Sequence, residues 1–302
     1  MPKENTHIYF AHGLIEHMHE EEIIRLIKGH IHAYYLGSVI PDTFYYSPKA
    51  SLEIVSETLH GRHGNTTNDI IFKVLEHLQG DQDTAFILGY ITHCALDMTF
   101  HPLVYYLSGN YYSEPPAAND RAVYMHRRIE TYIDSRLDNT LRIYDIVKPA
   151  HIRGLIFEKI ISDDFSLPIK EIYNTLWYQL CSNRIFASRA AYRIFKLSHR
   201  VNILKGISQL GLFYSDVRHG IKPLPDGHIA YRDIITGQDR HTTINGLFDA
   251  ARTRALPMIK AAFDYSRGLI SRQSLTKAIP GESLNTGMLN TPVSSIRYTL
   301  DQ

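Results

Sequence analysis

The sequence predicts an all-α protein with many helices. Apolar residues recur at helical spacing along most of the 302-residue chain, without a heptad run, an internal repeat or a glycine-rich phosphate loop. Residues 222–243 hold a turn signal at Pro225-Asp226-Gly227 and at most one short hairpin-like stretch. Hydrophobic residues make up 44% of the chain, which is enough for a sizeable core. We therefore expect helices that pack around a common interior.

Proline, glycine and polar clusters divide the apolar pattern into separate helices. Pro102 is expected to end the helix that begins near Asp83, because proline cannot donate the backbone hydrogen bond of a helix. Asn119 is placed to cap the helix that follows it. Residues 48–66 are expected to form a loop. The expected helices cover residues 6–28, 30–39, 67–79, 83–100, 120–144, 151–162, 168–181, 184–206 and 244–270.

The composition also predicts how the chain is divided. Residues 1–272 are expected to form a single helical domain. Residues 273–302 are rich in Ser, Thr, Gly and Asn, so we expect a weakly ordered C-terminal tail.

Charge and cysteine content restrict the classes of partner and compartment. The 32 Lys and Arg residues nearly balance the 31 Asp and Glu residues, which argues against a stable nucleic acid partner. Cys94 and Cys181 do not make a disulfide framework, as is typical of proteins in a reducing compartment. The first residues lack the pattern of a signal peptide, and no apolar run is long enough for a transmembrane segment. We therefore expect a cytoplasmic protein.

The most informative polar residues lie on one stripe of an expected helix. His93, Asp97 and His101 follow the apolar positions Phe86 and Tyr90 at spacings of three or four residues, so they share a core-facing stripe. Buried polar groups must find partners. Either a hydrogen-bonded His–Asp–His network or a metal ion satisfies this requirement, since imidazole and carboxylate groups are common zinc ligands.

A second expected helix repeats this arrangement. His126 and Glu130 are four residues apart, and their stripe continues through Ile133 and Leu137, so both are expected to point inward. Asp134 lies at the edge of the stripe, so we expect it to contact a ligand residue or to lie at the surface, rather than to bind metal itself.

The remaining candidates come from the first helix and two loops. His7 shares an apolar face with Ala11 and Leu14, whereas a group of later histidines lies on a face that is expected to be solvated. That group is His12, His17 and His19. Asp42 follows Pro41, and an Asp at such a position, taken alone, is commonly a turn or helix-capping residue rather than a metal ligand. His60 and His63 lie in an expected loop, where either histidine taken alone is more typical of a solvent-exposed side chain than of a metal ligand.

Five segments, in order, resemble the zinc-dependent phospholipase C family, whose fold is shared with single-strand-specific zinc nucleases. They are THIYFAHGLIEHM, YYLGSVIPDTFYY, SETLHG, GYITHCALDMTFHP and HRRIE, and together they cover roughly residues 5–140. Each short motif is weak alone, because helices often place His and an acid four residues apart, but the ordered combination is specific. The resemblance implies an all-α fold with a metal site between helices at about 5–140 and a helical remainder at about 150–272.

The resemblance also implies the ligands of two or three zinc ions. His60, His93 and Asp97 would hold the first ion, with Asp42 adjacent, and the segment SETLH favours His60 over His63. The second ion would bind His101, which follows the His93–Asp97 pair, together with the pair His126 and Glu130.

A third ion would bind His7 and share Asp97 as a bridging ligand. Secreted members of the family complete this third site with the amino group of an N-terminal Trp, which this chain lacks. The alternatives are a two-metal enzyme, or a site completed by the amine of Pro2 after removal of Met1.

The activity implied is hydrolysis of phosphate diesters, most of all phospholipid headgroups, by metal-bound hydroxide. Asp42 is the candidate general base, unless it is a ligand. Two other functions fit the same ligands: a nuclease or nucleotidase, and a non-catalytic metal-stabilised protein.

Overall fold

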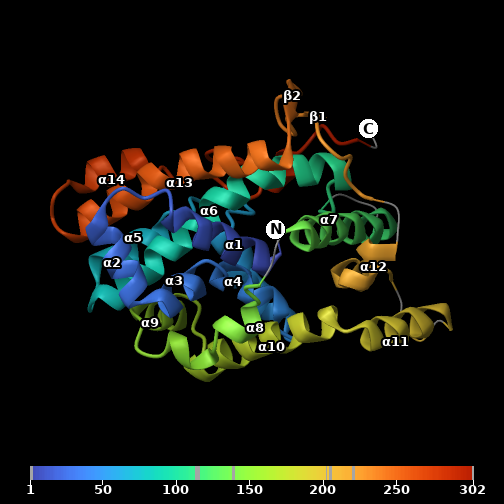
Figure 1. Cartoon of the computed structure of the whole chain (residues 1–302), viewed down its shortest axis with the longest axis horizontal. Coiled ribbons are helices and arrows are strands. Elements are labelled where there is room, and N and C mark those ends of the chain that lie inside the picture. Colours follow the sequence, from blue (N-terminus) through green and yellow to red (C-terminus); the bar gives the residue numbers. More distant parts are fainter. Residues whose placement is uncertain are drawn as a thin grey trace.

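The computed structural model describes residues 3–112, 116–137, 140–201, 203, 206–219 and 222–300, and its regular structure there is almost entirely helical (Figure 1). The N-terminal elements are α1 (Glu4–Ile15), α2 (Glu21–Gly29), α3 (Ile31–Gly37), η1 (Ile40–Tyr46), η2 (Ala50–Leu52), α4 (Glu53–Leu59), α5 (Asp69–Glu76), α6 (Asp81–Ser108) and α7 (Pro116–Arg136).

The second half of the chain adds further helices and one hairpin. These elements are α8 (Ile143–Ile146), η3 (Pro149–Ile152), α9 (Ile156–Asp164), α10 (Ile169–Ala187), α11 (Arg189–Arg200), η4 (Ser208–Leu212), α12 (Tyr214–His219), β1 (Ile229–Arg232), β2 (Asp239–Thr242), α13 (Ile244–Ser266), α14 (Arg272–Ala278) and η5 (Val293–Ser295). The antiparallel β1–β2 pair lies within residues 222–243, where the sequence predicts at most one short hairpin; residues 233–238 connect the strands, and Pro225-Asp226-Gly227 precede β1. Within the described ranges, we find no helix with the length and apolar character needed to cross a bilayer.

Helix α6 is the central element, and α1, α3, α5, α7 and α13 pack around it (Figure 1). Two glycines allow α3 to approach it closely. A Cβ atom at Gly37 would collide with the backbone of Phe86, and one at Gly89 would collide with the backbone of Tyr34. This close approach brings the chain that follows α3, including η1, beside the polar stripe of α6.

Helix α6 continues past Pro102 to Ser108, so the expectation that Pro102 ends it is wrong. Proline removes the N–H that would bond the carbonyl of Met98. Gly287, at φ +68°, lies against that carbonyl, and a Cβ atom there would come within 2.6 Å of it. The close approach of the C-terminal segment thus covers the backbone position that Pro102 leaves unpaired.

Other expected boundaries also differ from the structure. The helix expected at 120–144 is instead α7, which begins at Pro116 and ends at Arg136, so Asn119 lies inside it rather than at its cap. The expected helix 6–28 is divided into α1 and α2, with residues 16–20, which are mostly His and Glu, between them. The expected loop 48–66 contains α4. The expected helices 168–181 and 184–206 are replaced by α10 and α11, which are separated at Ser188, where the hydroxyl caps α11 by accepting a hydrogen bond from the N–H of Ala191.

The C-terminal segment, for which the sequence predicts a weakly ordered tail, contacts distant parts of the chain as far as residue 300. Leu284 is fully buried, and its N–H donates to the carbonyl of His60. Val293 donates in the same way to the carbonyl of Arg62. Polar composition suggested disorder, but the segment gains its order from hydrogen bonds to residues more than 200 positions away.

Candidate metal centre

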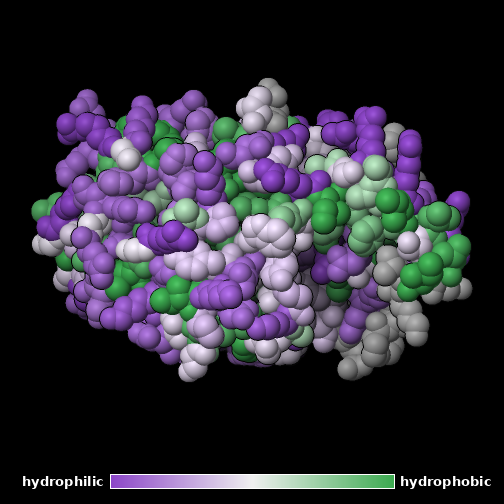
Figure 2. All heavy atoms as spheres, turned by 90° about the horizontal axis from the view of Figure 1, so that it is seen from below, coloured by the Kyte–Doolittle hydropathy of each residue, from purple (hydrophilic) through white to green (hydrophobic). Residues whose placement is uncertain are grey.

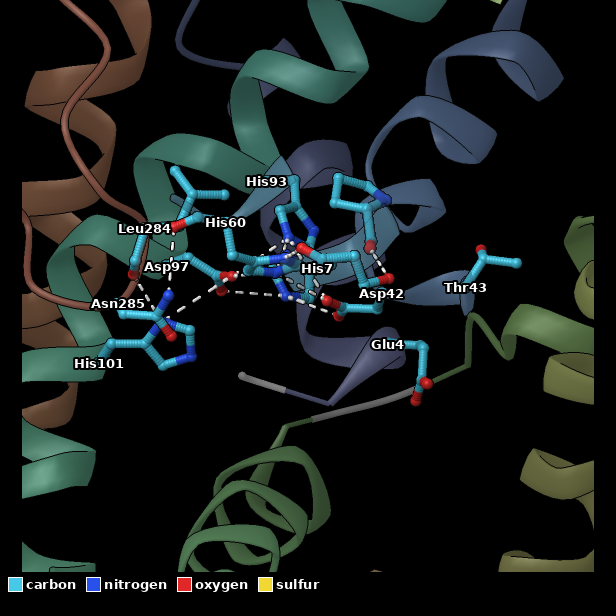
Figure 3. Close-up of polar contacts among 12 residues, drawn as sticks. Glu4, His7, Asp42, Thr43, His60, His93, Asp97, His101, Leu284 and Asn285 are labelled. Atoms are coloured by element: carbon cyan, nitrogen blue, oxygen red, sulfur yellow. Dashed lines mark hydrogen bonds and ion pairs between the residues drawn. The ribbon is translucent and has the colours of Figure 1, made fainter. Parts of the chain in front are cut away.

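Helix α6 carries the polar stripe that the sequence predicts into the centre of the molecule (Figure 3). His93, Asp97 and His101 are all buried. Their spacing of four residues places them on one face, because an α-helix advances 3.6 residues per turn. Helices α1 and α4 and the turn η1 bring further ligand-type residues toward this face.

Four side chains from three elements form the first cluster: Asp42, His60, His93 and Asp97. Five distances between their facing donor atoms lie between 3.1 and 3.6 Å. A tetrahedral zinc ion holds nitrogen and oxygen ligands at about 2.0–2.1 Å, which puts neighbouring ligand atoms about 3.3 Å apart. The donor atoms therefore fit one zinc ion.

Backbone carbonyls orient both histidines of this cluster. His60 Nδ1 lies 2.6 Å from the carbonyl of Ser56, and His93 Nδ1 lies 3.0 Å from the carbonyl of Ser38. Because a carbonyl only accepts, each Nδ1 carries the proton, and in the neutral rings each Nε2 presents a lone pair to the carboxylates. Lone pairs that converge in this way repel one another unless a cation lies between them.

His7, from α1, lies at the edge of the first cluster (Figure 3). Its Nε2 is 3.4 Å from Asp97 Oδ1 and 3.8 Å from Asp42 Oδ2, and its ring stacks on His93 at 4.0 Å. Neither ring nitrogen has a hydrogen-bond partner among the described residues. The geometry fits a further ion shared through Asp97. The amine of Pro2, which is the alternative ligand for that ion, lies outside the described residues.

The second cluster contains His101, His126 and Glu130, from α6 and α7. His126 Nε2 lies 2.9 Å from Glu130 Oε1. His101 Nδ1 lies 2.6 Å from the carbonyl of Leu284, so its Nε2 is left without a hydrogen-bond partner among the described residues. Three protein ligands leave one position of a tetrahedral ion for water or substrate.

A cleft of about 500 Å³ opens beside the second cluster. His126, Glu130 and Asp42 line it, so both clusters border the same space. Arg127 and Lys3 supply positive charge, and four tyrosines supply aromatic surface: Tyr45, Tyr46, Tyr111 and Tyr112. A larger cavity, between α1, α7 and α13, contains none of the eight candidate ligands.

Comparison with known proteins agrees with the ligand geometry. The family model for zinc-dependent phospholipase C matches residues 6–187, which include all eight candidate ligands. This chain belongs to the zinc-dependent phospholipase C family. It is also 30% identical over 109 residues to phosphatidylinositol-glycan-specific phospholipase D of Bos taurus, across 33% of this chain and 13% of the bovine protein. No solved structure matched.

The electrostatics of the first cluster favour bound cations in this family member. Burial would raise the pKa of Asp97, but the nearby charges of His93, His101 and His7 outweigh it and hold the pKa well below its usual range. Burial would lower the pKa of His60, whereas hydrogen bonds and charges from Asp42 and Asp97 raise it to about 9. Without metal, His60 is therefore protonated at neutral pH, and zinc must displace that proton.

The second cluster differs in its protonation. Burial lowers the pKa of His101 to about 3 and lowers the pKa of His126 well below its ordinary value. Both imidazoles are therefore neutral at physiological pH, which is the state that binds zinc.

The structure places the other candidate residues outside the clusters. His12, His17, His19 and His63 are all exposed. Asp134 is buried and accepts a hydrogen bond from the Tyr214 hydroxyl at 3.1 Å.

Sequence reasoning missed the C-terminal support of the site. The Leu284 carbonyl orients His101, and the Asn285 amide donates to the carbonyl of His60 at 3.1 Å (Figure 3). These residues lie beyond the region that matches the family model, and no local pattern marks them as partners of the metal site.

Proposed function

We propose that this protein is a zinc-dependent phosphodiesterase that hydrolyses phospholipid headgroups. The observation that carries this proposal is the pairing of a four-residue cluster with a three-residue cluster on one cleft. The first cluster can fill the coordination of one ion, and the second leaves a position open. Family membership and the name of the bovine relative support a phospholipid as substrate.

Bound zinc supplies Lewis acidity and lowers the pKa of a bound water to about 7. The cleft residues then have separate tasks. Arg127 and Lys3 attract the phosphate, since both carry positive charge on the cleft wall. Asp42 borders both the first cluster and the cleft, so it is placed to accept a proton from water as well as to bind metal.

A hydrolysis screen combined with a zinc measurement tests this function. The purified chain would be assayed on phosphatidylcholine, phosphatidylinositol and single-stranded DNA, with zinc counted by elemental analysis. We expect lipid headgroup release by the wild type and by the control variant His63→Ala, whose side chain is exposed, and none by His60→Ala. Bound zinc without turnover of any diester would instead show a structural metal site, and turnover of DNA alone would show a nuclease.

A further inference from the structure

Helix α11 presents an unusual exposed face. Ile194, Leu197 and Val201 follow one another at helical spacing, and they are 64%, 60% and 56% exposed. No residue of α11 is buried. In Figure 2, hydrophobic residues gather at one end of this side of the molecule, where Figure 1 places α11.

A basic stripe runs directly beside these apolar residues. Its four members are spaced so that they fall on one side of the helix, and all are exposed: Arg189, Arg193, Lys196 and Arg200. Tyr192 and Phe195 point the other way, and their rings lie 5.7 and 5.2 Å from the ring of Phe213. The helix thus has one side on the protein, one apolar side and one basic side toward solvent.

The segment that contains α11 is much more positively charged than the rest of the chain. Residues 172–215 contain six Lys and Arg residues and no Asp or Glu, which amounts to +6. Because the whole chain carries only +1, the remaining residues carry 1 − 6 = −5. A partner attracted by this charge must be anionic, and it must also accept apolar side chains.

We propose that α11 docks on the surface of an anionic phospholipid bilayer. A basic amphipathic helix that lies in the membrane interface has this combination of an apolar stripe and flanking cations. The neighbouring helix α10 adds Trp177 and Ile185, which are 54% and 45% exposed. Tryptophan is enriched at membrane interfaces, because its ring is apolar and its N–H is polar.

The position of α11 connects the surface with the cleft. Phe213, on which α11 packs, lies 5.2 Å from the ring of Phe186, and Phe186 lines the cleft together with Ser182 of α10. Docking through α11 therefore brings the cleft beside the lipid headgroups. This consequence rests on the proposed function, whereas the docking itself does not.

Vesicle flotation with the full chain tests the docking. We expect the protein to float with vesicles of phosphatidylcholine and phosphatidylserine and to remain free with phosphatidylcholine alone. Each basic residue near an anionic surface contributes roughly a factor of five in affinity, so Arg193→Glu with Lys196→Glu is expected to weaken binding roughly a hundredfold or more. The matched control is Arg25→Glu with Lys28→Glu, an exposed Arg and Lys pair at the same spacing on α2, which should float like the wild type.

A fluorescence measurement locates the contact. Trp177 is the sole tryptophan, so Trp177→Phe with Leu197→Trp gives a protein with one indole on α11. Its emission should shift to shorter wavelength on anionic vesicles. The proposal would be overturned if that shift were absent or if the Arg193/Lys196 double variant bound vesicles as well as the wild type. It would also be overturned if Leu197→Asp converted a dimer to a monomer, because the face would then bind a second copy of the chain.

The activity assay separates this inference from the proposed function. On a soluble short-chain phospholipid, the Arg193/Lys196 double variant should hydrolyse as fast as the wild type, and on anionic vesicles it should be slower. Vesicle binding through α11 without any lipid hydrolysis would leave the docking intact and remove the phospholipase function.

Discussion

The two ligand clusters are built differently, although they share one cleft and one long helix. The first cluster has four candidate ligands, from α6, η1 and the end of α4. Its histidines are oriented by the carbonyls of Ser38 and Ser56, which lie four residues before Asp42 and His60 in the sequence. The second has three ligands from α6 and α7, and His101 is oriented by Leu284, which is 183 residues away.

This difference indicates a division of labour. A four-ligand site is closed and holds its ion tightly, whereas a three-ligand site that lines a cleft can exchange water for substrate. The C-terminal segment supports both sites, because it bonds the carbonyl of His60 as well as the ring of His101. The number of ligands therefore makes the difference, and we expect the first site to retain zinc under conditions in which the second loses it.

The largest effect is expected for Asp97→Asn. Asp97 lies within 3.4 Å of the facing nitrogens of His7, His60 and His93, so loss of its charge weakens every ion near it. Activity should fall roughly a thousandfold or more, since bound metals contribute several kcal/mol to transition-state stabilisation. Elemental analysis should show loss of zinc as well, and full zinc content with full activity would contradict the assigned role of Asp97.

A smaller and more selective effect is expected for Glu130→Gln. The amide keeps the shape of the side chain but lowers the affinity of the second cluster for its ion. Loss of a residue that only orients a ligand typically costs about tenfold to a hundredfold, so loss of a ligand should lower activity roughly a hundredfold or more. Zinc in the first cluster should remain. If the variant released all of its zinc, the two clusters would form one cooperative site rather than two sites of different affinity.

Asn285→Ala tests the support from the C-terminal segment. This change removes the hydrogen bond to the carbonyl of His60 and the one that Tyr105 donates to Asn285 at 3.0 Å. Zinc affinity should fall roughly tenfold to a hundredfold, as for other residues that orient ligands. The experiment is a competition titration with a zinc chelator. An unchanged affinity would mean that the segment covers the site without orienting it.

The smallest effect on activity is expected for Asp134→Asn, one helical turn beyond Glu130. Burial raises the pKa of Asp134 to about 6 from its ordinary value of 3.8, which is opposite in direction to Asp97. The folded state therefore binds this proton more tightly than the unfolded state. The resulting stabilisation is present below about pH 4 and is lost as the pH rises through about 6, a change of about 3 kcal/mol.

The Asn variant should lack this pH dependence. Thermal unfolding of both proteins with saturating zinc, at pH 5 and at pH 7.5, measures it, and the variant should gain stability relative to the wild type at the higher pH. Both should retain their zinc and their activity. Loss of zinc from the variant would instead identify Asp134 as part of the metal centre.

The sequence alone determined the helical class and the pairs of ligands within single helices. His93 with Asp97, and His126 with Glu130, are visible in the sequence because helical geometry is local and repeats every few residues. Inward facing could be inferred in the same way from the apolar residues of each stripe. The order of the motifs then indicated the family.

Only the tertiary structure decided which separate pieces meet. Hydrogen bonds across the chain order the C-terminal segment, and a glycine from that segment covers the carbonyl that Pro102 leaves unpaired. The support of His101 by Leu284 and the exposed face of α11 depend on packing between elements far apart in sequence. Local patterns do not encode such contacts, because they depend on where the whole chain brings each element.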